Sequence, residues 1–317
     1  MHGRSVKNKW ILASPLLVAA LAAFLFLRPD SKGGNLGPEA YALTEEILAI
    51  GPRPPGSEGL DKVRALLRNE LEEAGWSVSF QEFENSTPIG RIKFANLRAR
   101  FSKKGDPWKN EIEGLLCAHI DSKYFEDKIF LGADDAASAC AAVVEIGKYL
   151  AAKQPEYAEK LELVLFDGEE AIKGDMTIMN GLYGSRFYAN SWRSLANKPR
   201  FGILLDMIGH ENLSIRIPSD SPKMLAELMF EAAKEKGVSR YFGTARGPIL
   251  DDHVPLNLVG IPTLDIIGNF QYMPWWHQAG DPDDPEKPAD DLSIVSEESL
   301  GISISVVLHM LDELLKD

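Results

Sequence analysis

The chain has 317 residues, of which 45% are hydrophobic and 26% are charged, as in an ordinary globular protein. Its 34 lysines and arginines stand against 47 aspartates and glutamates, which leaves a net charge of −13. This charge argues against nucleic acid as a partner, because phosphate binding requires a basic surface.

The N-terminal segment differs from the rest of the chain. Residues 10–27 carry no charge, follow a basic stretch and begin with Trp10. Eighteen residues are near the shortest length that spans a bilayer, and tryptophan favours the membrane interface. The sequence therefore predicts a basic cytoplasmic tail at 1–9, a transmembrane anchor at 10–27, a flexible stem at 28–38 and one large domain at 39–317.

The basic flank on the N-terminal side predicts a single-pass membrane protein whose N-terminus is cytoplasmic and whose large domain lies outside the cytoplasm. A cleaved signal peptide is the alternative, because Ala-Leu-Ala at 20–22 resembles a processing site. Cleavage there would leave the apolar residues 24–27 exposed at the new terminus, so an uncleaved anchor is favoured.

Apolar periodicity predicts alternating helices and strands beyond the stem. Helical spacing occurs at 38–50, 59–73, 136–152, 222–236 and 292–315. Residues 76–83 and 91–101 alternate apolar and polar positions, which predicts an antiparallel pair at one sheet edge. Short apolar runs at 114–120, 161–166, 201–205 and 262–267 are typical of buried parallel strands. The expected fold is an α/β three-layer sandwich around a mixed, largely parallel sheet.

Two adjacent glutamates, Glu169 and Glu170, follow the run at 161–166 after a short Asp-Gly turn. The turn places both carboxylates at the carboxyl end of a strand, where open α/β sheets bind their ligands. Neighbouring carboxylates repel each other, so a cation or a shared proton must hold them together. An isolated acidic pair is more often a solvated turn, and the other strand ends decide between the two interpretations.

Those other strand ends also carry metal-type side chains. They are His119 and Asp121 near 114–120, Asp134 and Asp135 before the helix at 136, Asp206 after 201–205, and His277 beyond 262–267. Each alone has an ordinary structural explanation, such as a helix cap or a hydrogen-bonded histidine. Together they offer oxygen and nitrogen ligands without a thiolate, which fits zinc in a catalytic role.

Several motifs resemble the animal-type glutaminyl-peptide cyclotransferases, or glutaminyl cyclases, which share the fold of the zinc aminopeptidases. They are Cys-Ala-His-Ile-Asp-Ser-Lys-Tyr-Phe at 117–125, Gly-Ala-Asp-Asp-Ala-Ala-Ser at 132–138, Phe-Asp-Gly-Glu-Glu-Ala at 166–171, Leu-Tyr-Gly-Ser-Arg at 182–186, Asp-Asp-His-Val-Pro at 251–255 and Trp-His at 276–277. The resemblance extends from about residue 38 to the C-terminus. It implies a zinc exopeptidase-like fold.

The resemblance also implies an activity and a set of site residues. The activity converts the N-terminal glutamine of peptides or proteins to pyroglutamate and releases ammonia, with glutamate a weaker substrate. The implied residues are Asp135, Glu170 and His277 as ligands of one zinc per chain, Glu169 as general acid and base, Asp206 and Asp251 as a carboxylate network, and Trp276 and Tyr272 as pocket wall.

The chain departs from this family pattern in several places. The stretch 172–176 lacks a tryptophan that forms one pocket wall in the family, and His210 replaces a small residue and is interpreted as a surface side chain. Cys140 matches one position of a family disulfide, but Cys117 is shifted by one residue and would face the opposite side of its strand. Whether the two cysteines are bridged stays open. The acidic, proline-rich stretch 281–291 is interpreted as a solvated loop near the pocket.

Two alternatives compete with the cyclase. A two-metal aminopeptidase of the same fold would use His119, Asp135, Glu170, Asp206 and His277, all of which are present, so a second metal at His119 and Asp206 is not excluded. A non-catalytic, membrane-anchored binding domain should have lost Glu169 or a zinc ligand, and none is missing. The physiological substrates and the oligomeric state cannot be read from the sequence.

Overall fold

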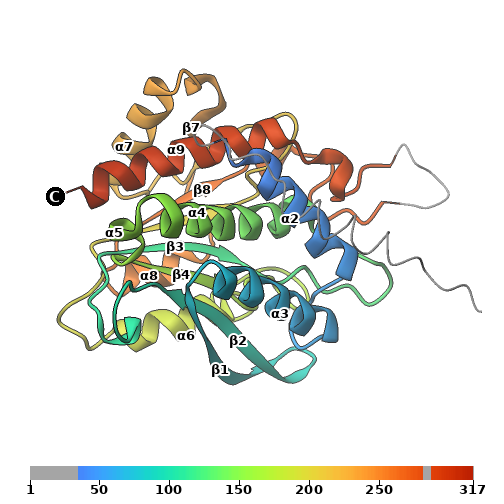
Figure 1. The fold of residues 1–317 in the computed structure, drawn as a ribbon. Helices are drawn as coiled ribbons and strands as arrows, with labels where there is room; N and C mark the ends of the chain where they lie inside the picture. Colours follow the sequence, from blue (N-terminus) through green and yellow to red (C-terminus); the bar gives the residue numbers. More distant parts are fainter. Residues whose placement is uncertain (1–34, 281–286, 317) are drawn as a thin grey trace, which may run out of the picture. The chain divides into compact units, whose positions relative to one another are not determined.

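The computed structural model describes residues 35–280 and 287–316, which form a sheet between two layers of helices (Figure 1). The sheet has six strands in the order β1-β2-β4-β3-β5-β8. The strands are β1 Ser77–Thr87, β2 Gly90–Arg100, β3 Gly114–His119, β4 Leu161–Phe166, β5 Phe201–Asp206 and β8 Thr263–Ile267. Strands β3, β4, β5 and β8 are parallel, and β1 and β2 form an antiparallel pair at one edge. The predicted α/β sandwich with a largely parallel sheet is confirmed.

Helices cover both faces of this sheet. One face packs against α2 Gly37–Ile50, α3 Glu58–Glu73, α4 Ala139–Lys153 and α9 Glu297–Leu315, with α7 Lys223–Glu235 beside α9. The other face packs against α6 Tyr183–Trp192 and α8 His253–Leu258. Shorter elements are α5 Pro155–Ala158, a small parallel pair β6 Ile215–Ile217 and β7 Phe242–Thr244, 3-10 turns at Pro107–Lys109, Ser239–Tyr241, Phe270–Tyr272 and Leu292–Ile294, and a π-type turn at Ala133–Ser138.

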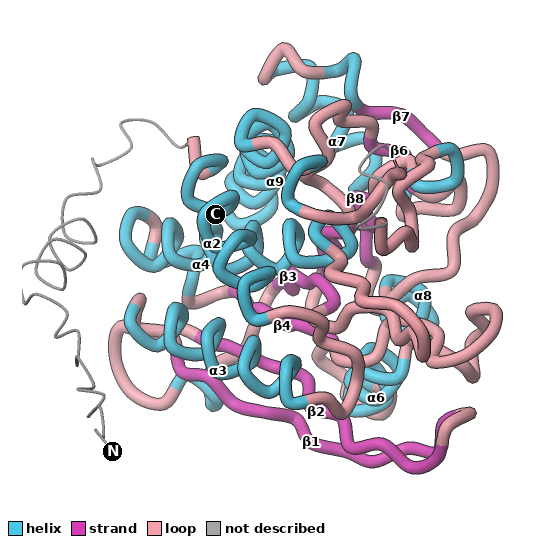
Figure 2. The backbone as a smooth tube through the Cα atoms, turned by 90° about the vertical axis from the view of Figure 1, so that its right-hand side faces the viewer, coloured by secondary structure: helices cyan, strands magenta, loops and turns pink. Residues whose placement is uncertain are grey.

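Most of the candidate site residues lie at the ends of the parallel strands or in the loops that follow them. In Figure 2, many of the loops lie on the side of β6, β8 and α8, away from α2, α3 and α4. Parallel strands end at the same edge of a sheet, so the segments after β3, β4, β5 and β8 meet there. The fold therefore gathers side chains that lie far apart in the sequence.

The observed helix boundaries differ from the predicted ones in three places. Helix α2 begins at Gly37, inside the predicted stem 28–38, because Pro38 suits a first helical turn and Leu36 is already buried. The range 292–315 divides into a 3-10 turn and α9, which starts after an N-cap at Ser296. The helix expected from residue 136 begins at Ala139, after the irregular turn that carries Asp134 and Asp135. Helices α6 and α8 were not predicted.

No helix in the described ranges is long and apolar enough to cross a membrane. The predicted tail, the predicted anchor and most of the predicted stem, residues 1–34, lie outside the described part of the chain. The anchor therefore stays a prediction from the sequence.

The two cysteines are free thiols on opposite sides of the sheet. Cys117 in β3 packs with the layer of α6 and α8, whereas Cys140 in α4 packs in the larger core on the other face. The Cys140 thiol donates a hydrogen bond to the carbonyl oxygen of His119 at 2.9 Å. The one-residue shift of Cys117 thus has the effect expected for a strand, because successive side chains alternate between faces.

One acidic side chain lies inside the buried run of β4. The Glu162 carboxylate is fully buried between two arginines of β2, with Arg98 Nε at 2.6 Å and Arg100 Nη2 at 2.5 Å. The hydroxyl of Tyr188 in α6 donates to the same carboxylate at 3.2 Å. These contacts join the antiparallel edge, the parallel sheet and one helix layer, and they compensate the cost of burying the charge.

We expect Glu162→Ala to lower the free energy of unfolding by about 3–5 kcal/mol, because it leaves two guanidinium groups without their buried partner. Urea unfolding followed by circular dichroism measures the change. The control is Glu156→Ala, whose exposed carboxylate lies 3.8 Å from Lys103 and should contribute less than about 1 kcal/mol. Equal effects of the two substitutions would show that the buried cluster does not stabilise the sheet.

Candidate active site

The ends of the parallel strands bring the predicted site residues into one cavity of about 510 Å³. Among its lining residues are Asp135, Glu169, Glu170, Asp206, Asp251, Trp276 and His277. They come from the turn before α4, the loops after β4 and β8, the last residue of β5 and the segment before α8. Seven of the eight residues predicted for the site thus surround a common space, and the eighth, Tyr272, has a side chain outside the described part.

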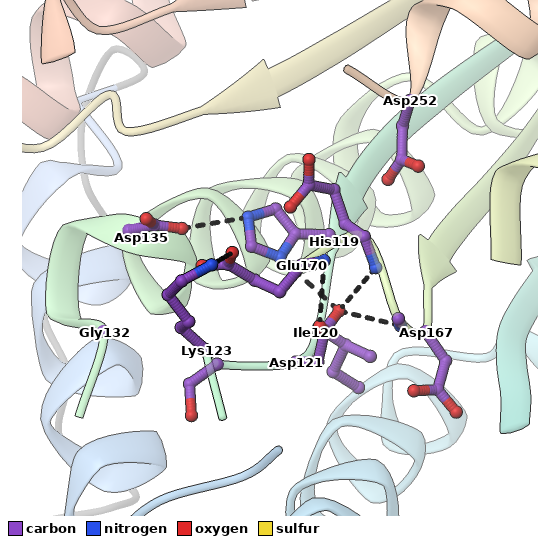
Figure 3. Close-up of polar contacts among 12 residues, drawn as sticks. His119, Ile120, Asp121, Lys123, Gly132, Asp135, Asp167, Glu170 and Asp252 are labelled. Carbon is purple, nitrogen blue, oxygen red and sulfur yellow. Dashed lines mark hydrogen bonds and ion pairs between the residues drawn. The ribbon is translucent and has the colours of Figure 1, made fainter. Parts of the chain in front are cut away.

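The turn after β4 is fixed by Asp121 (Figure 3). Its buried carboxylate accepts hydrogen bonds from the backbone N–H groups of Gly168 at 2.9 Å, Glu169 at 3.1 Å and Glu170 at 3.3 Å. Gly168 has a φ of 78°, and a side chain there would collide with the ring of Phe94 at 2.5 Å. Glycine and the Asp121 carboxylate together set the direction of the glutamate pair.

The three predicted zinc ligands meet around one point. Asp135, Glu170 and His277 each offer one ligand atom, and these atoms lie within 4.8 Å of one another. His277 Nε2 is 3.3 Å from Asp135 Oδ2 and 3.2 Å from Glu170 Oε1. Glu170 Oε1 is buried and has no hydrogen-bond partner among the described residues. Two carboxylates and one imidazole without thiolate are a donor set that fits a catalytic zinc.

The charge of this group also favours a cation. Burial lowers the pKa of His277, but the neighbouring carboxylates of Glu170 and Asp135 outweigh burial and raise it to about 9. An imidazole held protonated so far above its ordinary range reports a strongly negative site. A metal ion at the same place would supply the positive charge instead and leave the imidazole free to act as a ligand.

A second group of ligands adjoins the first through Asp135. His119 Nε2 lies 3.2 Å from Asp135 Oδ1 and 3.4 Å from Asp206 Oδ1. Both ring nitrogens of His119 are buried and lack a hydrogen-bond partner within the described ranges. The two oxygens of Asp135 therefore face two different imidazoles, as a bridging carboxylate would. The geometry alone permits a second metal here.

Glu169 has the environment of an acid–base group. It lines the cavity, is only 6% exposed and shares the cavity with Asp206 and Asp251. Burial raises the pKa of Glu169 well above its ordinary value, His119 partly opposes this, and Asp251 raises it further. Burial likewise raises the pKa of Asp206 to about 8 against the opposing effect of His119. Buried carboxyl groups that repel one another in this way are typical of acid–base sites, where they can exchange protons with a bound substrate.

The two tryptophans before His277 have different roles. Trp275 is buried and stacks on His210 with ring centroids 5.1 Å apart, so His210 is a buried residue and its interpretation as a surface side chain is wrong. Trp276 lines the cavity and stacks on His277 with ring centroids 4.0 Å apart, and its ring lies tilted against that of Phe270 at 4.8 Å. Residues 174–176, where the family tryptophan is missing, line the cavity with Met176 among them.

Asp290 was missed by sequence reasoning. It belongs to the stretch 281–291, which was interpreted as a solvated loop, and residues 281–286 of that stretch lie outside the described part. Asp290 itself is only 2% exposed, and its carboxylate accepts hydrogen bonds from the N–H groups of Asp134 at 2.7 Å and Asp135 at 3.2 Å. It positions a predicted zinc ligand through the backbone, and no local sequence signal marks that role.

Lys123 and Asp265 were also missed. Lys123 Nζ lies 2.9 Å from Glu170 Oε2 and lines the cavity, so it balances part of the charge of that carboxylate. Its position inside the motif at 117–125 was the available signal. Asp265 is fully buried in β8, where His253 Nδ1 lies 3.4 Å from its Oδ2. Burial raises its pKa well above the ordinary value, and nearby Asp251 raises it further.

Comparisons with known proteins identify the relatives of this chain. Residues 96–308 match the model of peptidase family M28. A glutaminyl-peptide cyclotransferase-like protein of Mus musculus is 32% identical over 279 residues, which cover 78% of this chain and 70% of that protein. The crystal structure of an Acidobacteriales bacterium glutaminyl cyclase superposes with a TM-score of 0.75 at 30% identity, covering 90% of this chain and 97% of that one.

A structure described as a zinc-dependent exopeptidase, from Parabacteroides distasonis, superposes with a TM-score of 0.72 at 25% identity and covers 89% of this chain and 98% of that one. The exopeptidase fold is thus shared by relatives of both kinds. The family match spans most of the chain, and the mouse relative shares about a third of its residues over most of both lengths. The chain belongs to peptidase family M28 and, within that family, to the glutaminyl-peptide cyclotransferases.

Proposed function

We propose that the protein is a zinc-dependent glutaminyl-peptide cyclotransferase, an acyltransferase that acts on the N-terminal glutamine of peptides and proteins. The product is pyroglutamate, ammonia is released, and N-terminal glutamate is a weaker substrate. The observation that carries this proposal is the meeting, in one cavity, of the ligand group Asp135, Glu170 and His277 with the buried Glu169. Membership of the cyclotransferase family supports the choice of reaction.

We infer one zinc ion per chain, held by Asp135, Glu170 and His277. Three protein ligands leave a coordination position open for the substrate. When bound there, zinc acts as a Lewis acid that polarises the side-chain amide of the glutamine. One such ion suffices for the reaction, because the attacking group is the amine of the substrate itself and no water has to be activated.

The chain's own residues carry the proton and shape the substrate. As the α-amine attacks the side-chain amide carbon, a carbon–nitrogen bond forms, the amine loses a proton and the amide nitrogen leaves as ammonia. Glu169 accepts the proton of the amine and returns it to the departing nitrogen. Asp206 and Asp251 line the same cavity. Their negative charges favour the protonated form of Glu169 after it has accepted the proton. Trp276 and Phe270 exclude water and favour an uncharged side chain, and the cavity holds the glutamine folded for attack.

A two-metal aminopeptidase is the second candidate, favoured by one observation. His119, Asp135 and Asp206 form a further ligand group beside the first. With two ions, Glu169 would act on a metal-activated water and a peptide bond would be cleaved. The relatives in the cyclotransferase family favour the first candidate.

The peptide test separates the two functions directly. We expect the purified protein to remove ammonia from a Gln-initiated peptide without cleaving it, and to leave a Leu-initiated peptide of the same remaining sequence unchanged. Mass spectrometry follows both peptides. Release of a free N-terminal residue from either peptide would indicate the aminopeptidase instead. Metal analysis of the same preparation should give one zinc per chain, whereas two would support the second candidate.

The adjacent glutamates allow a matched pair of variants. We expect Glu169→Gln to retain zinc and to lose turnover by about 10²- to 10⁴-fold, because an amide cannot carry the proton. Glu170→Gln should instead lower zinc binding, because it removes a charged ligand. Zinc content and kcat are measured for both variants. Turnover retained by the first variant would remove Glu169 from the mechanism, and equal zinc loss in both would disprove the division of roles.

We also infer from the sequence that residues 10–27 anchor the protein in a lipid bilayer, with the N-terminus in the cytoplasm and the catalytic domain outside it. The uncharged stretch of eighteen residues and the basic flank at Arg4, Lys7 and Lys9 support this topology.

We expect the full chain to stay with membranes during alkaline carbonate extraction, and a chain that starts at residue 35 to be soluble, because the uncharged stretch is absent from it. Quantitative blotting of the pellet and supernatant measures the difference. Protease treatment of intact cells or vesicles tests the side on which the domain lies. A mature N-terminus near residue 22 would show that the segment is a cleaved signal peptide instead.

A further inference from the structure

A smaller hollow of about 150 Å³ adjoins the catalytic cavity. Ile249, Phe270 and Gln271 line both spaces and form the wall between them. The far side of the hollow is built by β6 and β7, which lie near β8 in Figure 2. Ile215 of β6 forms a bridge to Gly268 at the end of β8. A peptide whose first residue occupies the catalytic cavity therefore has a second recess next to the place where its following residues leave that cavity.

Arg216 in β6 is held in place within this hollow. Its Nη1 donates hydrogen bonds to the carbonyl oxygens of Ile215 at 2.6 Å and Tyr241 at 3.3 Å. The guanidinium lies against the backbone of Gly243, where a side-chain carbon would come within 3.2 Å of Nη1. Its Nε and Nη2 have no acceptor among the residues that the structure describes. Arg216 thus presents donors whose position is fixed by the fold.

A second guanidinium, that of the exposed Arg246, lines the same hollow. Within residues 35–280 and 287–316, no carboxylate forms an ion pair with Arg216 or Arg246. The chain has 47 acidic and only 34 basic residues, yet no aspartate or glutamate stands among the described residues that line this hollow. Thr244 and Asn269 add polar groups to the lining.

We propose that this hollow is a subsite that binds a carboxylate of the substrate peptide. The proposal rests on the proposed cyclotransferase activity, which places the N-terminal glutamine in the adjoining cavity. An extended chain advances about 3.3–3.6 Å per residue, so the second or third residue reaches past the shared wall. Guanidinium groups bind carboxylates through paired, charge-assisted hydrogen bonds. The carboxylate belongs to an acidic side chain at position 2 or 3, or to the C-terminus of a very short peptide.

This subsite would offset the charge of the rest of the protein. A net charge of −13 repels acidic peptides at long range, whereas Arg216 and Arg246 attract them locally. The contact is made equally before and during the reaction, so it lowers KM rather than raising kcat. Because the hollow is open to solvent, added salt weakens the effect.

The test compares kcat/KM of the full chain on four peptides at low and high salt. Three are C-terminal amides with Gln followed by Glu-Glu, Ala-Ala or Lys-Lys, and the fourth is Gln-Ala-Ala with a free C-terminal carboxylate. We expect the Glu-Glu amide to exceed the Ala-Ala amide about tenfold at low salt, mainly through KM. A similar advantage of the free acid over its amide would assign the subsite to the C-terminal carboxylate.

Substitutions of the arginines then test whether the preference for the Glu-Glu peptide arises in the hollow. Arg246→Gln should bring the ratio of the Glu-Glu to the Ala-Ala peptide close to one, and Arg246→Lys should retain part of it. Arg240→Gln is the matched control, since Arg240 is an exposed neighbour that does not line the hollow, and the ratio should survive there. Arg216→Gln gives a second measurement, with circular dichroism to show that it is folded.

The outcomes separate this proposal from the function on which it rests. If no Gln-initiated peptide is cyclised, the proposed function fails. If all four peptides are cyclised with equal kcat/KM, or if the preference survives in both Arg246→Gln and Arg216→Gln, the function stands and the subsite is overturned.

Discussion

The carboxylate of Asp121 joins the end of β3 to the turn after β4 through three backbone hydrogen bonds. Each of these N–H groups is buried and would otherwise lack a partner, so the bonds fix the turn in one conformation. Because Glu169 and Glu170 are adjacent residues of that turn, one contact sets both the proposed zinc ligand and the proposed acid–base group (Figure 3). The separation of roles between neighbouring glutamates depends on this constraint.

Opposing charges then hold the site together. Asp135 lies between the imidazoles of His119 and His277, and Asp290 fixes the backbone on which Asp135 is carried. Beneath them, the fully buried Arg53 donates hydrogen bonds to the carbonyl oxygens of Ile120, Leu131 and Gly132. This guanidinium ties together the loops that bear Asp121 and Asp135. The buried guanidinium of Arg53 offsets part of the negative charge of these carboxylates, and a zinc ion at the proposed ligand group would offset more of it.

Structures described as a glutaminyl cyclase and as a zinc-dependent exopeptidase share this fold, so the fold alone does not set the reaction. The walls of the cavity include Met176 and Trp276, which stacks beside His277, and the adjoining hollow carries Arg216 and Arg246. The proposed metal ligands determine where a substrate carbonyl group is polarised, whereas the side chains of the cavity wall determine which peptide fits. The substrate range of this protein should therefore be sought in the loops rather than in the sheet.

The sequence by itself determined the strands of the large sheet and its antiparallel edge, because apolar periodicity is a local signal. It also placed metal-type side chains at the strand ends. The choice of Asp135, Glu170 and His277 among them came from the family resemblance, and the tertiary structure brings these three side chains together. Helices α6 and α8 were not predicted from the sequence because they are short and lack a long periodic pattern. Asp290 and the arginines of the hollow were decided only by the tertiary structure. Asp290 is 155 residues from Asp135, and the hollow joins Arg216 and Arg246 to residues 268–271 from another part of the chain. Contacts at such separations leave no periodicity or spacing in the sequence.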